Sequence, residues 1–181
     1  MRVAINGFGR IGRSVFRILN SKKNVSVVAI NDIADNDAMA YLLKYDTVMG
    51  PFKDSVSLEG DIMKTSKNQI KMVAERDPSL LPWKEMEVDV VIEATGIFRE
   101  KSQLQQHINA GAKRVILTVP SKDEIDYTLV IGVNDDGLNE DHKIISNASC
   151  TTNCLAPMAK ILNDSFEIEY GVINTIHAYT N

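Results

Sequence analysis

The stretch Gly7-Phe8-Gly9-Arg10-Ile11-Gly12 constrains the fold of this chain more than any other part of the sequence. Its G-x-G-x-x-G spacing follows a short apolar run, Arg2–Asn6, and opens an apolar pattern of helical period. A second apolar run, residues 25–30, ends in Asn31-Asp32, so an acidic residue lies twenty positions after the last glycine. A lone glycine-rich turn is weak evidence. Strand, turn, helix, second strand and terminal acid together predict a dinucleotide-binding βαβ unit.

Each glycine of this motif has its own physical task. Gly7 allows the tight turn, Gly9 lets the backbone approach a pyrophosphate, and Gly12 lets the helix pack close to the strand. The phosphates are expected on the backbone N–H groups of Arg10 and Ile11, at the positive end of the helix.

Asp32 predicts NAD rather than NADP as the cofactor. Its carboxylate would accept hydrogen bonds from the adenosine ribose hydroxyls and would repel a 2′-phosphate at the same place. The helix after the glycine turn is expected to leave Arg13 in solvent. Its predicted buried face has helical spacing and consists of Ile11, Val15, Ile18 and Leu19.

Later apolar runs extend this unit into a doubly wound, mostly parallel α/β sheet of Rossmann type. Buried strands are predicted where apolar residues run almost without interruption, at residues 88–93, 114–119, 128–133 and 143–146. Shorter alternating runs predict an antiparallel insertion packed on one side of this sheet, at residues 55–58, 61–64 and 69–73.

Ligands collect at the carboxyl ends of strands in such sheets. Thr95 and Gly96 follow the strand at 88–93 and are predicted to line the cofactor, with Phe98 beside them. Arg76 is a candidate for the adenine pocket. The histidines His107 and His142 have no neighbours in sequence that indicate a base or a ligand, so they are interpreted as surface or packing residues.

The second informative stretch surrounds Cys150, between a buried strand and a run of helical period. Ser149 is a plausible N-cap, which would place Cys150 in the first helical turn, where free N–H groups and the helix dipole favour a thiolate over a thiol. Cys150 is therefore the predicted nucleophile. Cys154 lies one turn further along the helix and is expected to pack into the core.

A cysteine nucleophile and a nicotinamide cofactor together indicate oxidation of an aldehyde. The thiolate adds to the aldehyde, the thiohemiacetal gives up a hydride, and the thioester is attacked by water or phosphate. A general base must take the hemiacetal proton, and His177 is the candidate. It follows residues 170–176, which are predicted to form a strand of a different sheet. The pairing of Cys150 with His177 is an inference, because sequence separation alone brings no residues together.

Three motifs resemble the phosphorylating, NAD-dependent glyceraldehyde-3-phosphate dehydrogenase family, at residues 6–13, 148–154 and 177–181. The resemblance covers all 181 residues. It implies oxidation of glyceraldehyde 3-phosphate with inorganic phosphate to 1,3-bisphosphoglycerate, a step of glycolysis and gluconeogenesis. By the same resemblance Cys150 is the nucleophile and His177 activates it. Ser149 and Thr151 would bind the attacking phosphate, and Thr180 the phosphate of the substrate. The implied NAD contacts are Arg10, Ile11, Asp32, Arg76 and Thr118, the last in place of a frequent serine.

The resemblance also implies an arrangement of domains. Residues 1–149 would be the NAD-binding domain, and residues 150–181 the first helix and strand of an α+β catalytic domain whose remainder is absent. The family implies a cytoplasmic homotetramer. This chain alone is expected to bind dinucleotide with little or no dehydrogenase activity. Two alternatives stay open, an erythrose-4-phosphate dehydrogenase and a catalytically inactive NAD-binding fragment.

Composition excludes several other classes. A net charge of -4 offers no basic field for nucleic acid or an anionic membrane, and no apolar run has the length of a membrane span. The two cysteines, four positions apart, match neither a disulfide framework nor a zinc site, and they fit a reducing cytoplasmic setting. No metal is expected.

Overall fold

Within residues 1–178, which a computed structural model describes, nine strands form one sheet in the order β3-β4-β5-β2-β1-β6-β7-β9-β8. The pairs formed by β3 with β4 and by β4 with β5 are antiparallel, and the other pairs are parallel. The strands are β1 Arg2–Asn6, β2 Ser26–Asn31, β3 Ser57–Glu59, β4 Ile62–Lys64, β5 Gln69–Val73, β6 Val90–Glu93, β7 Arg114–Leu117, β8 Tyr127–Thr128 and β9 Ile144–Ser146.

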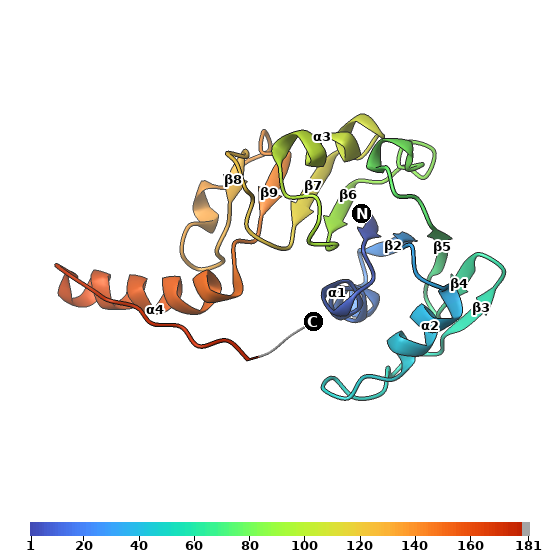
Figure 1. Ribbon diagram of the computed structural model, residues 1–181, viewed down its shortest axis with the longest axis horizontal. Coiled ribbons are helices and arrows are strands. Elements are labelled where there is room, and N and C mark those ends of the chain that lie inside the picture. The colour runs from blue at the N-terminus through green and yellow to red at the C-terminus, as the bar shows by residue number, and fades with distance from the viewer. Residues whose placement is uncertain (179–181) are drawn as a thin grey trace.

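Helices cover both faces of this sheet. The helices of the described residues are α1 Arg10–Ser21, α2 Asn36–Lys44, α3 Lys101–Asn109 and α4 Cys150–Phe166, with short 3₁₀ turns η1 Pro78–Leu80 and η2 Asp135–Gly137. The first two pack on one face of the sheet and α3 on the other. Figure 1 shows α3 above the sheet and α1 below it. The predicted doubly wound, Rossmann-type α/β fold is therefore confirmed.

Alternate residues of the strands supply two separate cores. Ile5 packs with Phe16 and Leu43 on the face covered by α1 and α2. Its neighbour Ala4 packs with Leu104 and other residues on the face covered by α3. Because successive side chains of a strand point to opposite faces, strands buried on both faces need the near-continuous apolar runs seen in the sequence.

The predicted insertion is part of the main sheet, contrary to the expectation that it packs on one side. β5 pairs in parallel with β2, and the β3–β4 hairpin continues the sheet from there. The expected buried face of α1 is also partly wrong, because Ile11 and Ile18 are 48% and 55% exposed. Gly12 and Phe16 are the buried residues of α1, since the close approach at Gly12 fixes which side of the helix meets the sheet.

The strand predicted at residues 128–133 ends at Thr128. The side chain of Asn134 donates to the Thr128 carbonyl and accepts from the Val130 N–H, so it occupies backbone groups that a longer strand would pair. The chain then turns at Gly132, where φ is +80°.

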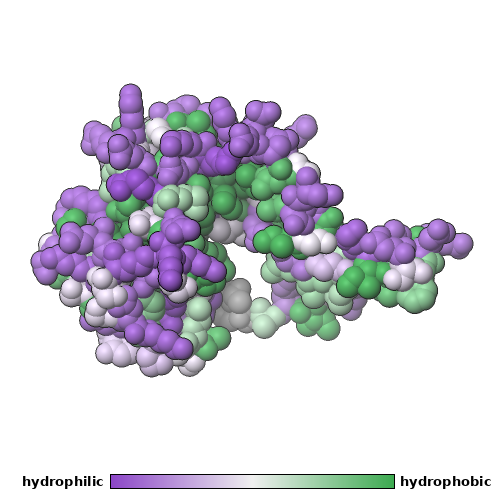
Figure 2. All heavy atoms as spheres, turned by 180° about the vertical axis from the view of Figure 1, so that it is seen from behind, coloured by the Kyte–Doolittle hydropathy of each residue, from purple (hydrophilic) through white to green (hydrophobic). Residues whose placement is uncertain are grey.

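α4 projects away from the sheet. Residues 167–178 then run back along α4 without regular structure (Figure 1). Figure 2 shows hydrophobic side chains along one side of this helix. Two of its large apolar residues, Met158 and Leu162, are about half exposed. The strand predicted at residues 170–176 is not formed, because a strand needs a partner for its backbone groups and none lies beside it in the described part of the chain. Across residues 1–178 we find no helix of the length and apolarity that a membrane span requires.

Candidate active site

The glycine turn between β1 and α1 is closely packed on one side and open on the other. Gly7 has a φ of +90°, and a Cβ there would lie 2.7 Å from the backbone nitrogen of Thr95. A Cβ on Gly12 would overlap the carbonyl oxygen of Gly7. A Cβ on Gly9 would meet nothing within 4 Å. Gly7 and Gly12 thus have the tight turn and the close helix contact predicted for them, and Gly9 leaves an open side, as its predicted approach to a pyrophosphate requires.

The N-terminus of α1 faces this open side with unused donors. Gly9 is the N-cap and has no side chain to cap the helix. Within the described residues, no hydrogen bond engages the backbone N–H groups of Arg10 or Ile11. Such free N–H groups, together with the helix dipole, form an anion site. The arrangement fits the pyrophosphate of a dinucleotide.

Asp32 follows β2 and is half-buried beside the glycine turn. Its Oδ2 accepts from the backbone N–H of Phe8 at 2.6 Å, and its Oδ1 accepts from that of Ala34 at 2.9 Å. Each carboxylate oxygen has a second lone pair, so Asp32 can still accept from a ribose hydroxyl. Its hold on the glycine turn is a structural task that the sequence did not reveal.

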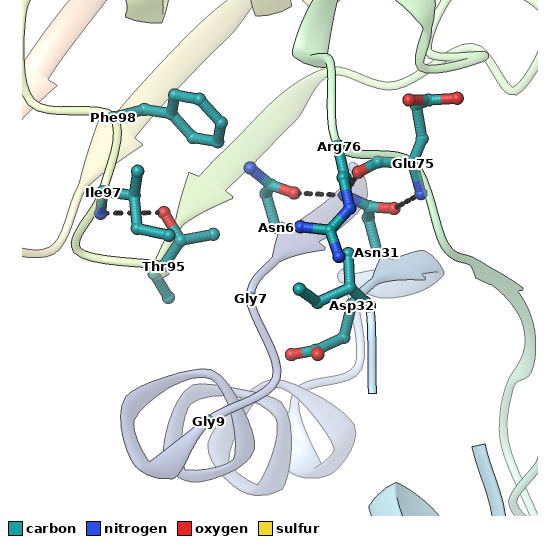
Figure 3. Close-up of a pocket in the computed structure, with 12 residues that line it drawn as sticks. Asn6, Gly7, Gly9, Asn31, Asp32, Glu75, Arg76, Thr95, Ile97 and Phe98 are labelled. Carbon is teal, nitrogen blue, oxygen red and sulfur yellow. Dashed lines mark hydrogen bonds between the residues drawn. The ribbon is translucent and has the colours of Figure 1, made fainter. Parts of the chain in front are cut away.

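A cavity of about 430 Å³ opens at the carboxyl ends of β1, β2 and β6, within the size range of small-molecule sites. Figure 3 shows Arg76 and Asp32 on one side of it and Thr95, Ile97 and Phe98 on the other. Five residues predicted for the cofactor line this cavity, namely Gly7, Gly9, Asp32, Arg76 and Thr95.

Two further predicted contacts lie outside the cavity wall. The hydroxyl of Thr118 donates to the carbonyl of Glu93 at 3.1 Å, and Gly96 is exposed in the turn beyond Thr95 with a φ of +73°. Their roles toward a cofactor stay predictions.

The sequence reading missed the amide side chains of the cavity. Asn6 and Asn31 are buried at the ends of β1 and β2 and line it. Polar residues that end apolar strands were the available signal. Arg13 is half-buried, contrary to the expectation that it lies in solvent, and its Nη1 donates to the Phe8 carbonyl at 2.8 Å. Burial lowers the pKa of Arg13, against the opposing effect of the Asp46 carboxylate.

Cys150 is the first residue of α4, as predicted, and its side chain is exposed. The hydroxyl of Ser149 caps the helix by accepting from the N–H of Thr152 at 2.9 Å. Cys154 is exposed as well, so its expected packing in the core is wrong. The reason is that α4 has no buried residue against the rest of residues 1–178.

His177 lies beside the start of α4. Its Nε2 is 3.2 Å from the hydroxyl oxygen of Thr151, the residue after Cys150. This contact brings His177 to the residue that follows Cys150, but no hydrogen bond joins His177 to Cys150 in the described part of the chain, so their pairing stays a prediction. Thr180, predicted for the substrate phosphate, lies outside the described residues.

The other two histidines do not line the cavity, which agrees with their interpretation as residues other than a base or a ligand. His107 is fully buried, and His142 stacks on Tyr127 with ring centroids 4.7 Å apart. Nowhere in residues 1–178 do three or more His, Cys, Asp or Glu side chains form a group that could hold a metal.

The parallel sheet, the glycine turn and the cavity at the strand ends define a dinucleotide-binding protein of the Rossmann type. The family model described as the glyceraldehyde 3-phosphate dehydrogenase NAD binding domain matches residues 1–101, and the model of the C-terminal domain of the same enzyme matches residues 149–181. The chain therefore belongs to the glyceraldehyde-3-phosphate dehydrogenase family, and NAD is the cofactor of the domain that it contains.

Curated relatives agree with this assignment. The glyceraldehyde-3-phosphate dehydrogenase of Borreliella burgdorferi is 53% identical over 186 residues, which cover 100% of this chain and 55% of the relative. That of Thermotoga maritima is 52% identical over 182 residues, 99% of this chain and 54% of the relative. That of Streptomyces coelicolor is 50% identical over 183 residues, 100% of this chain and 54% of the relative. The chain spans about half the length of these relatives.

Proposed function

We propose that this chain carries the NAD-binding domain and the nucleophile of a phosphorylating glyceraldehyde-3-phosphate dehydrogenase. In this proposal residues 1–149 form the cofactor domain, and residues 150–181 begin the catalytic domain. The observation that carries it is the position of Cys150, exposed at the start of α4 with His177 held beside the adjacent Thr151. Membership of the family supports glyceraldehyde 3-phosphate as the proposed substrate.

The cofactor would be held by groups already present in the cavity. The free N–H groups of Arg10 and Ile11 would bind the pyrophosphate, Asp32 would accept from the ribose, and Arg76 would reach the adenine side. Bound NAD supplies a nicotinamide ring that accepts a hydride. Thr95 and Phe98 form the opposite wall, where they would exclude water from the ring.

Cys150 would begin the reaction as a thiolate, favoured by the N–H groups of the first turn of α4. Its sulfur attacks the aldehyde carbon, a C–S bond forms, and the carbonyl oxygen takes up a proton to give a thiohemiacetal. His177 then accepts the hydroxyl proton as the carbon is oxidised to the thioester. An oxygen of inorganic phosphate attacks the thioester carbon, and the Cys150 thiolate leaves.

Hydroxyl groups near the nucleophile would hold the phosphates. Ser149 and Thr151 flank Cys150, and the Thr151 hydroxyl also contacts His177. Each hydroxyl can donate its proton to a phosphate oxygen and still accept a hydrogen bond from its present partner. That partner is Thr152 for Ser149 and His177 for Thr151. Thr180 is the proposed contact for the phosphate of the substrate. The homotetramer and the cytoplasmic setting implied by the family stay predictions.

NAD reduction is the test, measured on a protein in which these residues are joined to the rest of a catalytic domain of this family. We expect reduction with glyceraldehyde 3-phosphate that requires inorganic phosphate, that is lost in Cys150→Ser and that persists in Cys154→Ser. Faster turnover with erythrose 4-phosphate would assign the chain to the alternative aldehyde. Full activity in Cys150→Ser would refute the proposed nucleophile.

A further inference from the structure

Glu93 is fully buried at the end of β6 and does not line the cofactor cavity. Its Oε1 accepts from the N–H of Thr95 at 2.8 Å and from the Thr95 hydroxyl at 2.5 Å. Its Oε2 accepts from Asn6 Nδ2 at 2.5 Å and lies 3.1 Å from His107 Nε2. Four donors therefore converge on one carboxylate, which is the number of acceptor sites that its two oxygens offer.

His107 and Trp83 hold this carboxylate from the α3 side of the sheet. Trp83 Nε1 can only donate, so His107 Nδ1, 3.0 Å away, must accept. His107 Nε2 is then the atom that donates to Glu93. Both rings are fully buried, so water cannot replace either partner. The hydrogen bonds therefore run in one direction, from Trp83 to His107 and from His107 to Glu93.

On the cavity side, Glu93 controls where the Thr95 turn lies. The Thr95 hydroxyl, held by Glu93, also accepts from the N–H of Ile97 at 3.1 Å, which fixes the turn itself. This turn touches the glycine turn directly, since a Cβ on Gly7 would lie within 2.8 Å of the Thr95 Cα. The two turns form neighbouring parts of the cavity wall.

The second oxygen of Glu93 reaches the opposite wall through Asn6. Asn6 Oδ1 accepts from Asn31 Nδ2 at 2.7 Å. The Asn31 side chain both donates to the carbonyl of Glu75 and accepts from its N–H, each at 2.8 Å. Asn6, Asn31 and Glu75 all line the cavity. One buried carboxylate thus ends two series of hydrogen bonds, one to each wall.

We propose that Glu93 is a positioning residue for the dinucleotide, which sets the separation of the two cavity walls without touching the ligand. The inference rests on the proposed function in one respect only, that NAD binds in this cavity. A buried acid that positioned nothing would contribute little to stability, because the cost of its desolvation offsets its attractions. Replacement of Glu93 would leave the buried groups of Thr95, Asn6 and His107 that donate to it without an acceptor.

Glu93→Gln is the first test, because it keeps the shape and replaces one acceptor oxygen by a donor NH₂. That NH₂ must face either the Thr95 N–H or the pair formed by Asn6 and His107. It is expected to face Thr95, whose surroundings are partly open to water, and so to release the Thr95 turn. By calorimetry on the whole chain, the dissociation constant for NAD should rise by about tenfold, or about 1.4 kcal/mol.

Thr95 and Leu104 provide the matched controls. Thr95→Ser keeps the hydroxyl that donates to Glu93 and should bind NAD more tightly than Thr95→Val, which should reproduce the loss seen in Glu93→Gln. Leu104 is a residue of α3 that is buried against the face of the sheet opposite to the glycine turn. Leu104→Val should lower the midpoint of thermal unfolding and leave NAD affinity unchanged.

The outcomes separate this inference from the function on which it rests. No NAD binding by the unaltered chain would overturn both. Binding by the unaltered chain with equal affinity in Glu93→Gln would overturn the positioning role alone. If Glu93→Gln does not fold, the Thr95 pair decides: equal affinities of Thr95→Val and Thr95→Ser overturn the proposal, and a selective loss in Thr95→Val supports it. A loss in Leu104→Val as large as that in Glu93→Gln would also overturn it.

Discussion

The carboxylate of Asp32 accepts a hydrogen bond from the backbone N–H of Phe8 at 2.6 Å, so the acid that follows β2 fixes the glycine turn that follows β1. The spacing of the glycines and the acid in the sequence therefore has two physical reasons. One is the hydrogen bond to the cofactor ribose proposed for Asp32, and the other is its hold on the turn whose N–H groups are proposed to bind the pyrophosphate. Substitutions of Asp32 must be chosen so that these two effects are separated.

Asp32→Asn is expected to narrow the preference for NAD over NADP by about tenfold, because it removes the charge that repels a 2′-phosphate and keeps an oxygen to accept from Phe8. Asp32→Ala should weaken both cofactors, since the glycine turn also loses its acceptor. Calorimetric dissociation constants for the two cofactors measure this. Asp35→Asn is the control, because Asp35 caps α2 and Asn is an equally good cap. An unchanged ratio in Asp32→Asn would contradict the role in selectivity.

Cys150 should be alkylated faster than Cys154, although both thiols are exposed. Cys150 is the first residue of α4, whereas Cys154 lies one turn further along, where the influence of the helix terminus has faded. An interaction of about 0.3–1 kcal/mol corresponds to a rate difference of about two- to fivefold. Limited labelling with iodoacetamide at neutral pH and peptide mapping measure it, with Cys150→Ser and Cys154→Ser as references. Preferential labelling of Cys154 would be the opposite result.

Asp126 should make the protein more sensitive to acid. Its Oδ2 accepts from the backbone N–H groups of Lys143 and Ile144, each at 2.9 Å, and its Oδ1 pairs with Lys101 Nζ at 2.9 Å. Burial alone would raise the pKa of Asp126, but the hydrogen bonds from Lys101, Ile144 and Lys143 outweigh it, so the pKa is lowered. The stabilisation is therefore fully present above the unfolded-state pKa of about 3.9 and is lost as the pH falls through the folded-state value.

The corresponding measurement compares urea midpoints at neutral pH and at successive pH values below about 4. Asp126→Asn should lower the midpoint at neutral pH and show a shallower further loss in acid than the unaltered chain. Asp136→Asn, at an exposed position of η2, should leave both unchanged. Parallel acid profiles for the unaltered chain and Asp126→Asn would show that this carboxylate has no such effect.

Features set by local geometry were predictable from the sequence. The glycine turn, the capped start of α4 at Ser149 and the buried strands each depend on residues close in the chain. The pairing of β5 with β2 depends instead on which sheet edge is free, and the short runs 55–73 carry no mark of that edge. The strand expected at residues 170–176 failed for the same reason, since a strand exists only with its partner.

The same difference between local features and contacts of distant segments applies to the candidate site. Residues expected to meet the ligand can be named from the motif, because a phosphate or a ribose favours a residue type at a fixed position. The hydrogen bonds from Trp83 through His107 to Glu93 cannot be named in this way, because they join three separate segments and depend on the direction of each donor. A histidine such as His107 in an ordinary helical pattern carries no sequence mark of this role.

Substitutions of Gly12 and Gly9 should separate an effect on folding stability from an effect on NAD binding. A Cβ on Gly12 overlaps the backbone oxygen of Gly7, so Gly12→Ala must displace α1 from β1. It should lower the urea midpoint markedly. A Cβ on Gly9 meets nothing within 4 Å, and Gly9 has a φ of −68°, which alanine adopts freely. Gly9→Ala should thus keep the stability of the unaltered chain or gain about 0.4–1 kcal/mol through the unfolded state.

NAD binding, unlike stability, should be sensitive to the substitution of Gly9. The methyl group of Gly9→Ala would occupy the open side of the turn, where the pyrophosphate must approach the N–H groups of Arg10 and Ile11. Its NAD affinity should therefore fall by at least about tenfold in calorimetry while its urea midpoint is retained. Gly171→Ala, also with open space around its Cβ but away from the cavity, should change neither quantity. If Gly9→Ala bound NAD as tightly as the unaltered chain, the pyrophosphate could not lie on this face of the turn.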